Sequence, residues 1–216
     1  MANHFVLVAG NIGAGKTSLT EKLGERLGWK TAFESVVDNP YLADFYTDMA
    51  KWAFHLQIFF LGHRAEQHRN LAHTNKSSII DRSIYEDAEI FSRAALKLGT
   101  IQARDFESYQ RVYQLVVNSL PAPNLLILLR APVDVLLQRI QERAREMESG
   151  ITQDYLELLD GLYTDWIERF DLCPVLTIKS DDLDFVHHPP HLDVVIQRIQ
   201  ARLSGKEELH FPAGSD

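Results

Sequence analysis

A glycine-rich stretch near the start of the chain ends in a lysine and a threonine. Residues 10–17 read GNIGAGKT, which has the spacing G-x-x-x-x-G-K-[ST] of a phosphate-binding loop. Glycines let successive backbone N–H groups face one anion, and the dipole of a following helix strengthens their field. Lys16 then reaches the β and γ phosphates, and the Thr17 hydroxyl is available to Mg²⁺. The residues expected to hold a nucleoside triphosphate are Gly10, Asn11, Ile12, Gly13, Ala14, Gly15, Lys16, Thr17 and Ser18.

The elements on both sides of this stretch favour a phosphate loop over a glycine-rich turn without a ligand. An apolar run at residues 6–9 is typical of a buried strand, and Leu19, Leu23 and Leu27 follow at the spacing of a helix. Further strand patterns lie at residues 77–80, 125–129 and 175–178. Helical patterns separate them. This alternation predicts a three-layer α/β fold of the P-loop NTPase type, in which helices flank a parallel sheet.

Three charged residues fall at the ends of predicted strands. Glu34 follows a short extended piece at residues 30–33, and Asp81 and Arg82 follow the strand pattern at residues 77–80. In an open α/β sheet, ligands bind at the edge where the carboxyl ends of the strands meet. We therefore expect these three side chains to lie beside the phosphate loop.

These residues match the needs of phosphoryl transfer. The reaction requires a metal bridge, positive charge on the moving group, and a group that orients or deprotonates the acceptor. Thr17 and Asp81 are the candidates for the magnesium site, and Lys16 and Arg82 supply positive charge. Glu34 is the candidate base, and Asp81 competes for that role because it lies at the same edge.

A helical stretch that opens at Pro132 carries alternating charges. Its basic residues include Arg139, Arg143 and Arg145, which are interleaved with glutamates up to Glu148. Alternating charges are typical of a solvated helix face. The alternative is an arginine-rich, mobile lid that closes over the transferred phosphate. Both interpretations remain open from the charge pattern alone.

A long helical pattern spans residues 42–73, and its middle is apolar almost all round, which is typical of a buried helix. Tyr46, Gln57 and Arg64 are separated by 11 and 7 residues, so they share one face if the helix is continuous. A polar line along a buried helix needs either internal partners or a ligand.

Two more helical patterns cover residues 84–98 and 104–120. Asp87 and Phe91 lie four residues apart in the first and so share a face. The second carries an apolar stripe, which we interpret as core or subunit interface rather than as a site.

The composition fits one domain. The chain has 216 residues, of which 45% are hydrophobic, so we expect a single P-loop domain over residues 1–203 and a flexible tail over residues 204–216. The formal charge of −8 disfavours DNA or RNA as a partner. Cys173 is the single cysteine, which excludes an internal disulfide. The first residues resemble neither a signal peptide nor a membrane span, and a cytoplasmic protein without a membrane partner is expected.

Three other classes share parts of this pattern. A GTPase would carry N-K-x-D to read guanine, but the only Asn-Lys pair, Asn75-Lys76, continues with two serines. A nucleoside monophosphate kinase of the thymidylate kinase type also has a phosphate loop and an Asp-Arg pair, and it would need arginines to clamp the phosphate of its acceptor. A nucleotide-binding protein without turnover would leave the ionisable cluster unexplained.

Five separate motifs follow one another along the chain. They are GNIGAGKT at residues 10–17, ESV and NPYL within residues 34–42, Gln57 with Arg64, DRSIYED at residues 81–87, and a lid that ends in ESGI at residues 148–151. Their order and spacing resemble the deoxyribonucleoside kinases, among which the bacterial deoxyadenosine/deoxyguanosine kinases look most similar. The resemblance runs from the first strand to about Tyr155.

The resemblance implies roles at the sugar and the transferred phosphate. Glu34 would act as the base on the 5′-hydroxyl, and Arg82 would bridge Glu34 and the phosphoryl group. Asp81 stands where the family often has a glutamate, so its contact with the metal would be more water-mediated. Tyr46 and Glu148 would bind the 3′-hydroxyl.

The resemblance also implies how the base is read. Gln57 would pair with the base edge through both atoms of its amide, which suits adenine or cytosine. Arg64 and Asp87 would complete the reading, a pair that a thymidine-specific enzyme is expected to lack, and Phe91 would stack on the ring. The lid arginines would be Arg139, Arg143 and Arg145. The implied activity is ATP- and Mg²⁺-dependent 5′-phosphorylation of a deoxyribonucleoside by a homodimer, with deoxyadenosine or deoxyguanosine favoured and deoxycytidine a further candidate.

Overall fold

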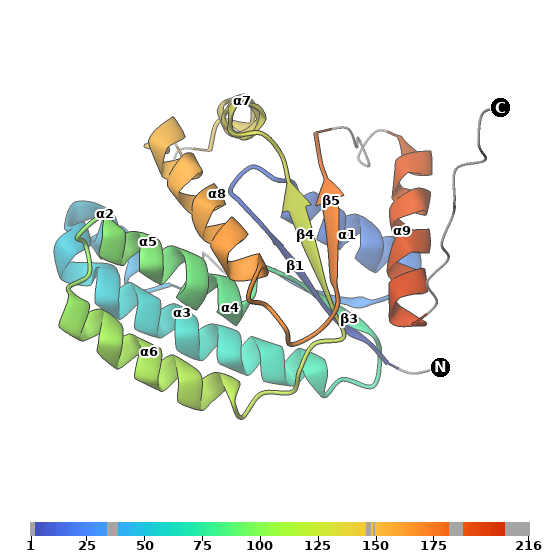
Figure 1. Cartoon of the computed structure of the whole chain (residues 1–216), viewed down its shortest axis with the longest axis horizontal. Helices are drawn as coiled ribbons and strands as arrows, with labels where there is room; N and C mark the ends of the chain where they lie inside the picture. Colours follow the sequence, from blue (N-terminus) through green and yellow to red (C-terminus); the bar gives the residue numbers. More distant parts are fainter. Residues whose placement is uncertain (1–2, 34–38, 146–147, 149, 182–187, 206–216) are drawn as a thin grey trace.

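The computed structural model of the chain describes residues 3–33, 39–145, 148, 150–181 and 188–205. At its centre lies a five-stranded parallel sheet with the strand order β2-β3-β1-β4-β5, which confirms the predicted fold class (Figure 1). The predicted strand patterns coincide with these strands. The strands are β1 (Phe5–Gly10), β2 (Lys30–Ala32), β3 (Ser78–Asp81), β4 (Leu125–Arg130) and β5 (Val175–Lys179).

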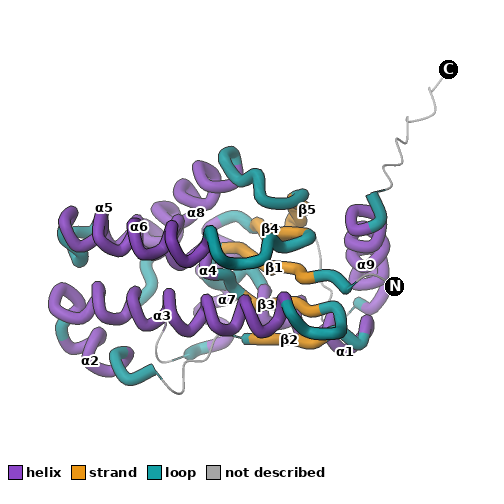
Figure 2. Tube along the Cα trace, turned by 90° about the horizontal axis from the view of Figure 1, so that it is seen from below, coloured by secondary structure: helices purple, strands orange, loops and turns teal. Residues whose placement is uncertain are grey.

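Helices cover both faces of the sheet. They are α1 (Lys16–Leu27), α2 (Leu42–Thr47), α3 (Met49–Ala72), α4 (Ile84–Glu86), the π-helix η1 (Asp87–Phe91), α5 (Ser92–Lys97), α6 (Ala103–Val117), α7 (Val133–Arg143), α8 (Gln153–Ile167) and α9 (Pro189–Leu203). Alternate residues of β1 enter two different apolar cores. Leu7 and Ala9 pack with α3, α6 and α8, whereas Val6 and Val8 pack with α1, α7 and α9. Figure 2 shows α3 and α6 side by side on their face.

The register of the sheet brings the phosphate loop and the end of β3 to one edge. Val8 of β1 pairs with Asp81, and Gly10 pairs with Leu129 of β4. The chain passes very close to β4 here, because a Cβ on Gly10 would lie 2.5 Å from the Leu129 carbonyl oxygen. Only glycine fits at this position, where the loop leaves the sheet.

The predicted helix that contains Tyr46, Gln57 and Arg64 is interrupted in the structure. Asp48 separates α2 from α3 with φ −151° and ψ 87°, outside the helical region. Its carboxylate accepts a hydrogen bond from Lys51 N (3.0 Å) and so caps α3. The condition of one continuous helix is therefore not met. Gln57 and Arg64 share α3, whereas Tyr46 comes from a separate helix.

The helix predicted after β3 contains a wider turn. Residues Asp87–Phe91 form the π-helix η1, with α4 before it and α5 after it. Turns of this kind are rare and occur often at functional sites. Both residues expected to contact the base from this segment, Asp87 and Phe91, lie at its two ends.

The predicted lid helix ends before its last arginine. Ala144 adopts a left-handed conformation with φ 46° and ψ 41°, and α7 stops at the residue before it. Arg139 and Arg143 therefore lie on the helix, whereas Arg145 lies beyond its end. The chain then reaches α8, which packs with α7.

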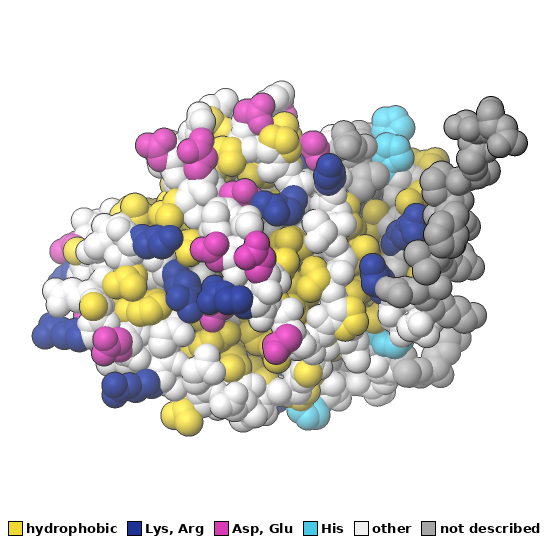
Figure 3. Space-filling model, viewed as in Figure 1, with side chains coloured by type: hydrophobic (Ala, Val, Ile, Leu, Met, Phe, Trp, Pro, Cys, Tyr) yellow, Lys and Arg dark blue, Asp and Glu magenta, His cyan; other side chains and the backbone are white. Residues whose placement is uncertain are grey.

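The face drawn in Figure 3 carries mixed charges. Around α5 and the end of α8, basic and acidic side chains line one pocket, which contains Arg93, Lys97, Asp165, Glu168 and Arg169. Among the helices within the described ranges, none combines the length and the apolar character needed to cross a membrane. Most of the predicted tail, residues 206–216, lies outside the described part of the chain.

Candidate active site

The phosphate loop is held by helices on two sides. Gly13 has φ +84°, and a Cβ there would lie 2.8 Å from the Leu136 carbonyl oxygen of α7. The Asn11 side chain accepts a hydrogen bond from Ile12 N (2.8 Å) and donates one to the Leu156 carbonyl of α8 (2.9 Å). The loop therefore contacts the predicted lid helix directly.

Lys16 begins α1 and is buried. Its Nζ donates hydrogen bonds to the carbonyl oxygens of Gly10 (2.8 Å) and Asn11 (2.9 Å). These bonds hold the ammonium group against the loop, where the motif predicts the terminal phosphates of a nucleotide.

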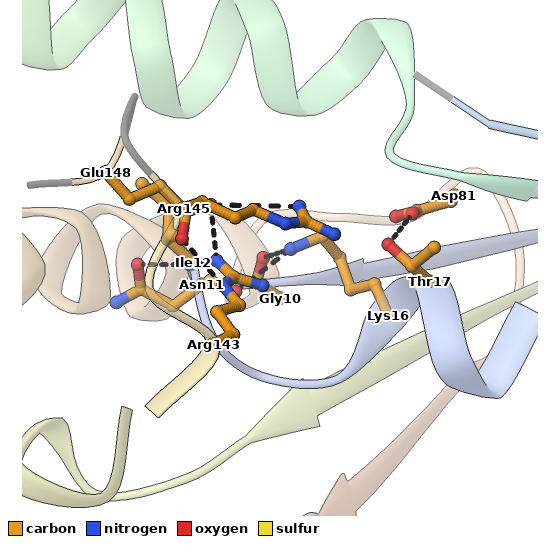
Figure 4. A network of polar contacts seen from close by, with 9 residues as sticks. All are labelled: Gly10, Asn11, Ile12, Lys16, Thr17, Asp81, Arg143, Arg145 and Glu148. Atoms are coloured by element: carbon orange, nitrogen blue, oxygen red, sulfur yellow. Dashed lines mark hydrogen bonds and ion pairs between the residues drawn. The ribbon is translucent and has the colours of Figure 1, made fainter. Parts of the chain in front are cut away.

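The two candidate magnesium ligands lie in contact. Thr17 Oγ1 donates a hydrogen bond to Asp81 Oδ2 (2.5 Å), which joins α1 to the end of β3 (Figure 4). A hydroxyl and a carboxylate are the oxygen ligands that Mg²⁺ prefers, and this ion keeps waters and substrate phosphates in the rest of its shell. The donor set of the pair therefore fits the ion.

Arg82 occupies an unusual backbone conformation in the turn after β3. Its φ is +67°, a backbone angle that residues other than glycine rarely adopt. Its N–H donates to the Val8 carbonyl (3.0 Å), and its guanidinium carbon lies 4.2 Å from the centre of the Phe91 ring. The turn thus directs the guanidinium toward η1, where it is attracted to the face of an aromatic ring.

The predicted base-reading residues come together between α3 and η1. Arg64 Nε lies 2.5 Å from Asp87 Oδ2, and the two side chains are 1% and 5% exposed. Arg64 Nη1 also donates to the Arg82 carbonyl oxygen (3.2 Å). Gln57 is buried, and its Oε1 has no hydrogen-bond partner among the described residues. Because such an orphan acceptor is costly, a ligand that donates to it is favoured.

Tyr155 lies near two of the predicted site residues, and the sequence patterns did not single it out. Burial raises the pKa of its hydroxyl, Arg82 lowers it, and Tyr46 raises it, so both residues lie near this hydroxyl. Tyr46 itself is 49% exposed on α2. An aromatic residue in an amphipathic helix is usually part of the core, so the pattern of α8 contained no signal for a site.

Two of the three lid arginines converge on Glu148 (Figure 4). Arg143 forms a two-pronged pair with it, with Nε–Oε2 and Nη2–Oε1 distances of 2.6 Å. Arg145 Nη1 lies 3.9 Å from Oε1. Arg139 instead donates to Ser180 beyond β5, at 3.3 Å to Oγ and 2.6 Å to the carbonyl oxygen. The lid arginines therefore split into a pair around Glu148 and a single residue held at β5.

Glu34, the predicted base, lies outside the described residues. The preceding residue is anchored, because the Phe33 carbonyl accepts a hydrogen bond from Gln67 Nε2 of α3 (3.0 Å). β2, which precedes it, pairs in parallel with β3. Its carboxyl end therefore reaches the same sheet edge as Asp81.

A central parallel strand that enters a phosphate loop, with an Asp-Arg turn at the neighbouring strand, defines a P-loop phosphotransferase. The family model for deoxynucleoside kinases matches residues 6–204. The chain belongs to the deoxynucleoside kinase family, and it is an enzyme that phosphorylates a deoxynucleoside to its monophosphate.

Individual relatives agree with this assignment. The chain is 37% identical to the deoxyadenosine/deoxycytidine kinase of Bacillus subtilis, over 91% of this chain and 92% of the relative. It is 33% identical to the deoxyguanosine kinase of Lactobacillus acidophilus, over 98% and 96%. A solved structure of the deoxyadenosine kinase from M. mycoides with dCMP and a flexible dCDP has a TM-score of 0.79 at 26% identity, covering 91% of this chain and 99% of that one. The predicted family and fold are therefore confirmed.

Proposed function

We propose that the chain transfers the γ-phosphoryl group of ATP to the 5′-hydroxyl of deoxyadenosine or deoxyguanosine, with deoxycytidine as a further acceptor. The observation that carries the proposal is the double contact of the turn after β3. Asp81 binds Thr17 beside the phosphate loop, and the next residue, Arg82, contacts Arg64 and Phe91 of the base site. The donor and acceptor sites therefore share two adjacent residues.

On the donor side, the loop N–H groups and Lys16 bind the triphosphate. Lys16 already lies against the loop through its bonds to two carbonyl oxygens. Mg²⁺ bound by Thr17 and Asp81 would neutralise negative charge on the β and γ phosphates. The arginine pair next to the loop, Arg143 and Arg145, adds positive charge for the transferred group, and Arg139 is a further lid candidate.

On the acceptor side, the base lies against Phe91 and is read by α3 and η1. The orphan Gln57 Oε1 accepts a hydrogen from an exocyclic amino group, which adenine and cytosine both carry beside a ring acceptor. Arg64 supplies guanidinium donors of the kind that suit guanine O6 and N7. These contacts support purine deoxynucleosides and deoxycytidine over thymidine.

Glu34 removes the proton from the 5′-hydroxyl as that oxygen attacks the γ phosphorus. The bond between this phosphorus and the bridging oxygen breaks, and ADP leaves. Arg82 stabilises the charge on the transferred group. Tyr46 and Glu148 bind the 3′-hydroxyl. A carboxylate has about four lone-pair positions, so Glu148 can accept this bond while it keeps its pair with Arg143.

The assembly we expect is a homodimer of single-domain subunits, spanning residues 1–203, in the cytoplasm. α6 supports this expectation because its Val112 and Leu115 side chains are 44% and 74% exposed. A second copy of the chain would remove this apolar surface from water.

The proposal is tested by incubating the enzyme with ATP, MgCl₂ and each of the four deoxynucleosides in turn. We expect the highest kcat/KM for deoxyadenosine or deoxyguanosine, a lower value for deoxycytidine and the lowest for thymidine. Thymidine as the best acceptor, or no monophosphate from any of the four, would contradict it.

A further inference from the structure

Glu86 is a fully buried carboxylate, and the roles assigned above do not use it. Its Oε2 accepts hydrogen bonds from Ser83 N (2.8 Å) and Ser83 Oγ (3.2 Å). Its Oε1 accepts from Gly10 N (3.3 Å) and Tyr163 Oη (2.7 Å). One side chain therefore joins the first glycine of the phosphate loop, the turn that carries Arg82, and helix α8.

Tyr163 completes the enclosure of the Gly10 peptide. Its single hydroxyl hydrogen faces two acceptors, Glu86 Oε1 (2.7 Å) and the Gly10 carbonyl oxygen (2.8 Å), so the two acceptors share it. Glu86 also accepts from the Gly10 N–H, and both polar atoms of Gly10 are therefore in contact with this pair of side chains. Burial, followed by the negative charge of Glu86, raises the pKa of Tyr163 well above its ordinary value, so the hydroxyl keeps its hydrogen. The same Gly10 carbonyl accepts from Lys16 Nζ (2.8 Å).

We propose that Glu86 and Tyr163 are positioning residues for the phosphate donor. They fix the Gly10 peptide, and through its carbonyl they fix the place of Lys16, in the geometry that receives the triphosphate. Neither residue touches a reacting atom. The proposal rests on the ATP site proposed above and adds to it two residues from outside the phosphate-loop motif. The pair of Glu86 and Tyr163 acts by preorganisation, because a loop that is already ordered need not be rearranged when the nucleotide binds.

Glu86 also binds Ser83, through its second carboxylate oxygen. The same carboxylate that holds Gly10 also holds the Ser83 N–H, one residue after the strained Arg82. The phosphate loop and the arginine of the turn are thus kept in register by one buried group. A mutation of Glu86 is expected to disturb both, whereas a mutation of Tyr163 acts on the loop side alone.

The test is Tyr163→Phe, which removes one hydroxyl and keeps the buried ring. The affinity for ATP with Mg²⁺ is measured by titration calorimetry without nucleoside, and KM is measured for ATP and for deoxyadenosine. We expect the Kd and KM for ATP to rise about threefold to tenfold, the range for one lost hydrogen bond, with the KM for deoxyadenosine changed by less than about twofold. A purely structural role would lower the melting temperature without this split between the two KM values.

A second variant, Glu86→Gln, keeps the shape of the side chain but replaces an acceptor by an NH₂ group. In either orientation that NH₂ faces a backbone N–H, of Ser83 or of Gly10. We therefore expect a loss of ATP affinity of more than about tenfold. Adding Tyr163→Phe to Glu86→Gln is expected to lower the ATP affinity by a smaller factor than Tyr163→Phe does in the wild type, because the two side chains are hydrogen-bonded to each other.

The matched control is Tyr85→Phe. Tyr85 precedes Glu86 in the chain and is also buried, but its ring packs edge-on against Phe170. Unchanged ATP affinity for Tyr163→Phe, equal rises in both KM values, or the same change in Tyr85→Phe would overturn the proposal. A wild type that binds ATP but phosphorylates no deoxynucleoside would refute the proposed function alone, since the affinity comparison still decides whether the pair positions the loop.

Discussion

Arg82 shows how single residues of this site are held against their own preference. A non-glycine residue with a left-handed backbone costs about 1–3 kcal/mol and persists only where its surroundings impose it. Here the backbone N–H is bound by Val8, the carbonyl by Arg64, and the guanidinium by the Phe91 ring. Such over-determination is typical of residues whose position matters for chemistry.

The buried pair of Arg64 and Asp87 predicts an effect on base preference. Asp87→Ala is expected to change the ratio of kcat/KM values between deoxynucleosides by about tenfold, the effect of one lost base contact, while the best rate falls less. The variant also leaves a buried guanidinium without its partner, which costs about 3–5 kcal/mol of stability. The assay is therefore run at a temperature where circular dichroism shows a folded variant.

The control for this variant lies in the same π-helix. Glu89 lies within η1 but pairs with Arg93 of α5, so Glu89→Ala is expected to leave the base preference unchanged. An equal loss of kcat/KM for every deoxynucleoside in Asp87→Ala would argue against a role in base reading.

Glu34 provides a separate prediction, about the removal of the proton from the 5′-hydroxyl. β2 pairs with β3 through Ala32 and Ile80, so the chain leaves β2 at the edge that holds Asp81. Glu34→Gln is expected to lower kcat by a factor of about 10²–10⁴, as for loss of a general base, with the Kd of the deoxynucleoside nearly unchanged. A kcat for Glu34→Gln close to that of the wild type would exclude Glu34 as the base and leave Asp81 as the candidate.

At the scale of elements, local spacing predicted well what depends on neighbours in the chain. The phosphate loop, α1 and the strands follow from short patterns around residues such as Lys16. The break at Asp48 was not predicted, because a capping residue with good helix formers on both sides is compatible with a continuous helix. In a π-helix the backbone hydrogen bonds join residues five apart instead of four apart, and the residues of η1 contain no sequence signal for this difference.

The contacts of the lid lead to a prediction about the sugar. Glu148 holds Arg143 beside the phosphate loop and is proposed to bind the sugar 3′-hydroxyl. The wild type is therefore expected to prefer deoxyadenosine over 2′,3′-dideoxyadenosine by about tenfold or more, the value of a hydrogen bond to a charged group. Glu148→Ala is expected to lose most of this preference in kcat/KM.

A matched variant separates this role from a general effect of lid charge. Glu142 lies on α7 next to Arg143, whereas Glu148 lies beyond the end of α7, and the Glu142 carboxylate accepts a hydrogen bond from Gln138 at the surface. Glu142→Ala is therefore expected to keep the preference. Full retention of the preference in Glu148→Ala would show that another residue binds the 3′-hydroxyl.

At the scale of the whole molecule, the site exists because distant segments meet at one sheet edge. The S-x-x-E spacing of Ser83 and Glu86 is a visible capping box, but its bonds to Gly10 and Tyr163 cross more than 70 residues of chain. The same holds for the approach of Tyr155 to Arg82. No local pattern contains such contacts, so the sequence predicted the parts of the site and the tertiary fold supplied its supporting shell.

The central claim is that the phosphoryl group passes from the loop to an uncharged sugar alcohol. ATP labelled at its γ-phosphate, incubated with the enzyme, MgCl₂ and either deoxyadenosine or deoxyadenosine monophosphate, tests this most directly. The account predicts labelled monophosphate from the nucleoside and no labelled diphosphate from the nucleotide. Labelled diphosphate formed at a comparable or higher rate would contradict it, because the acceptor site would then be built for a phosphate.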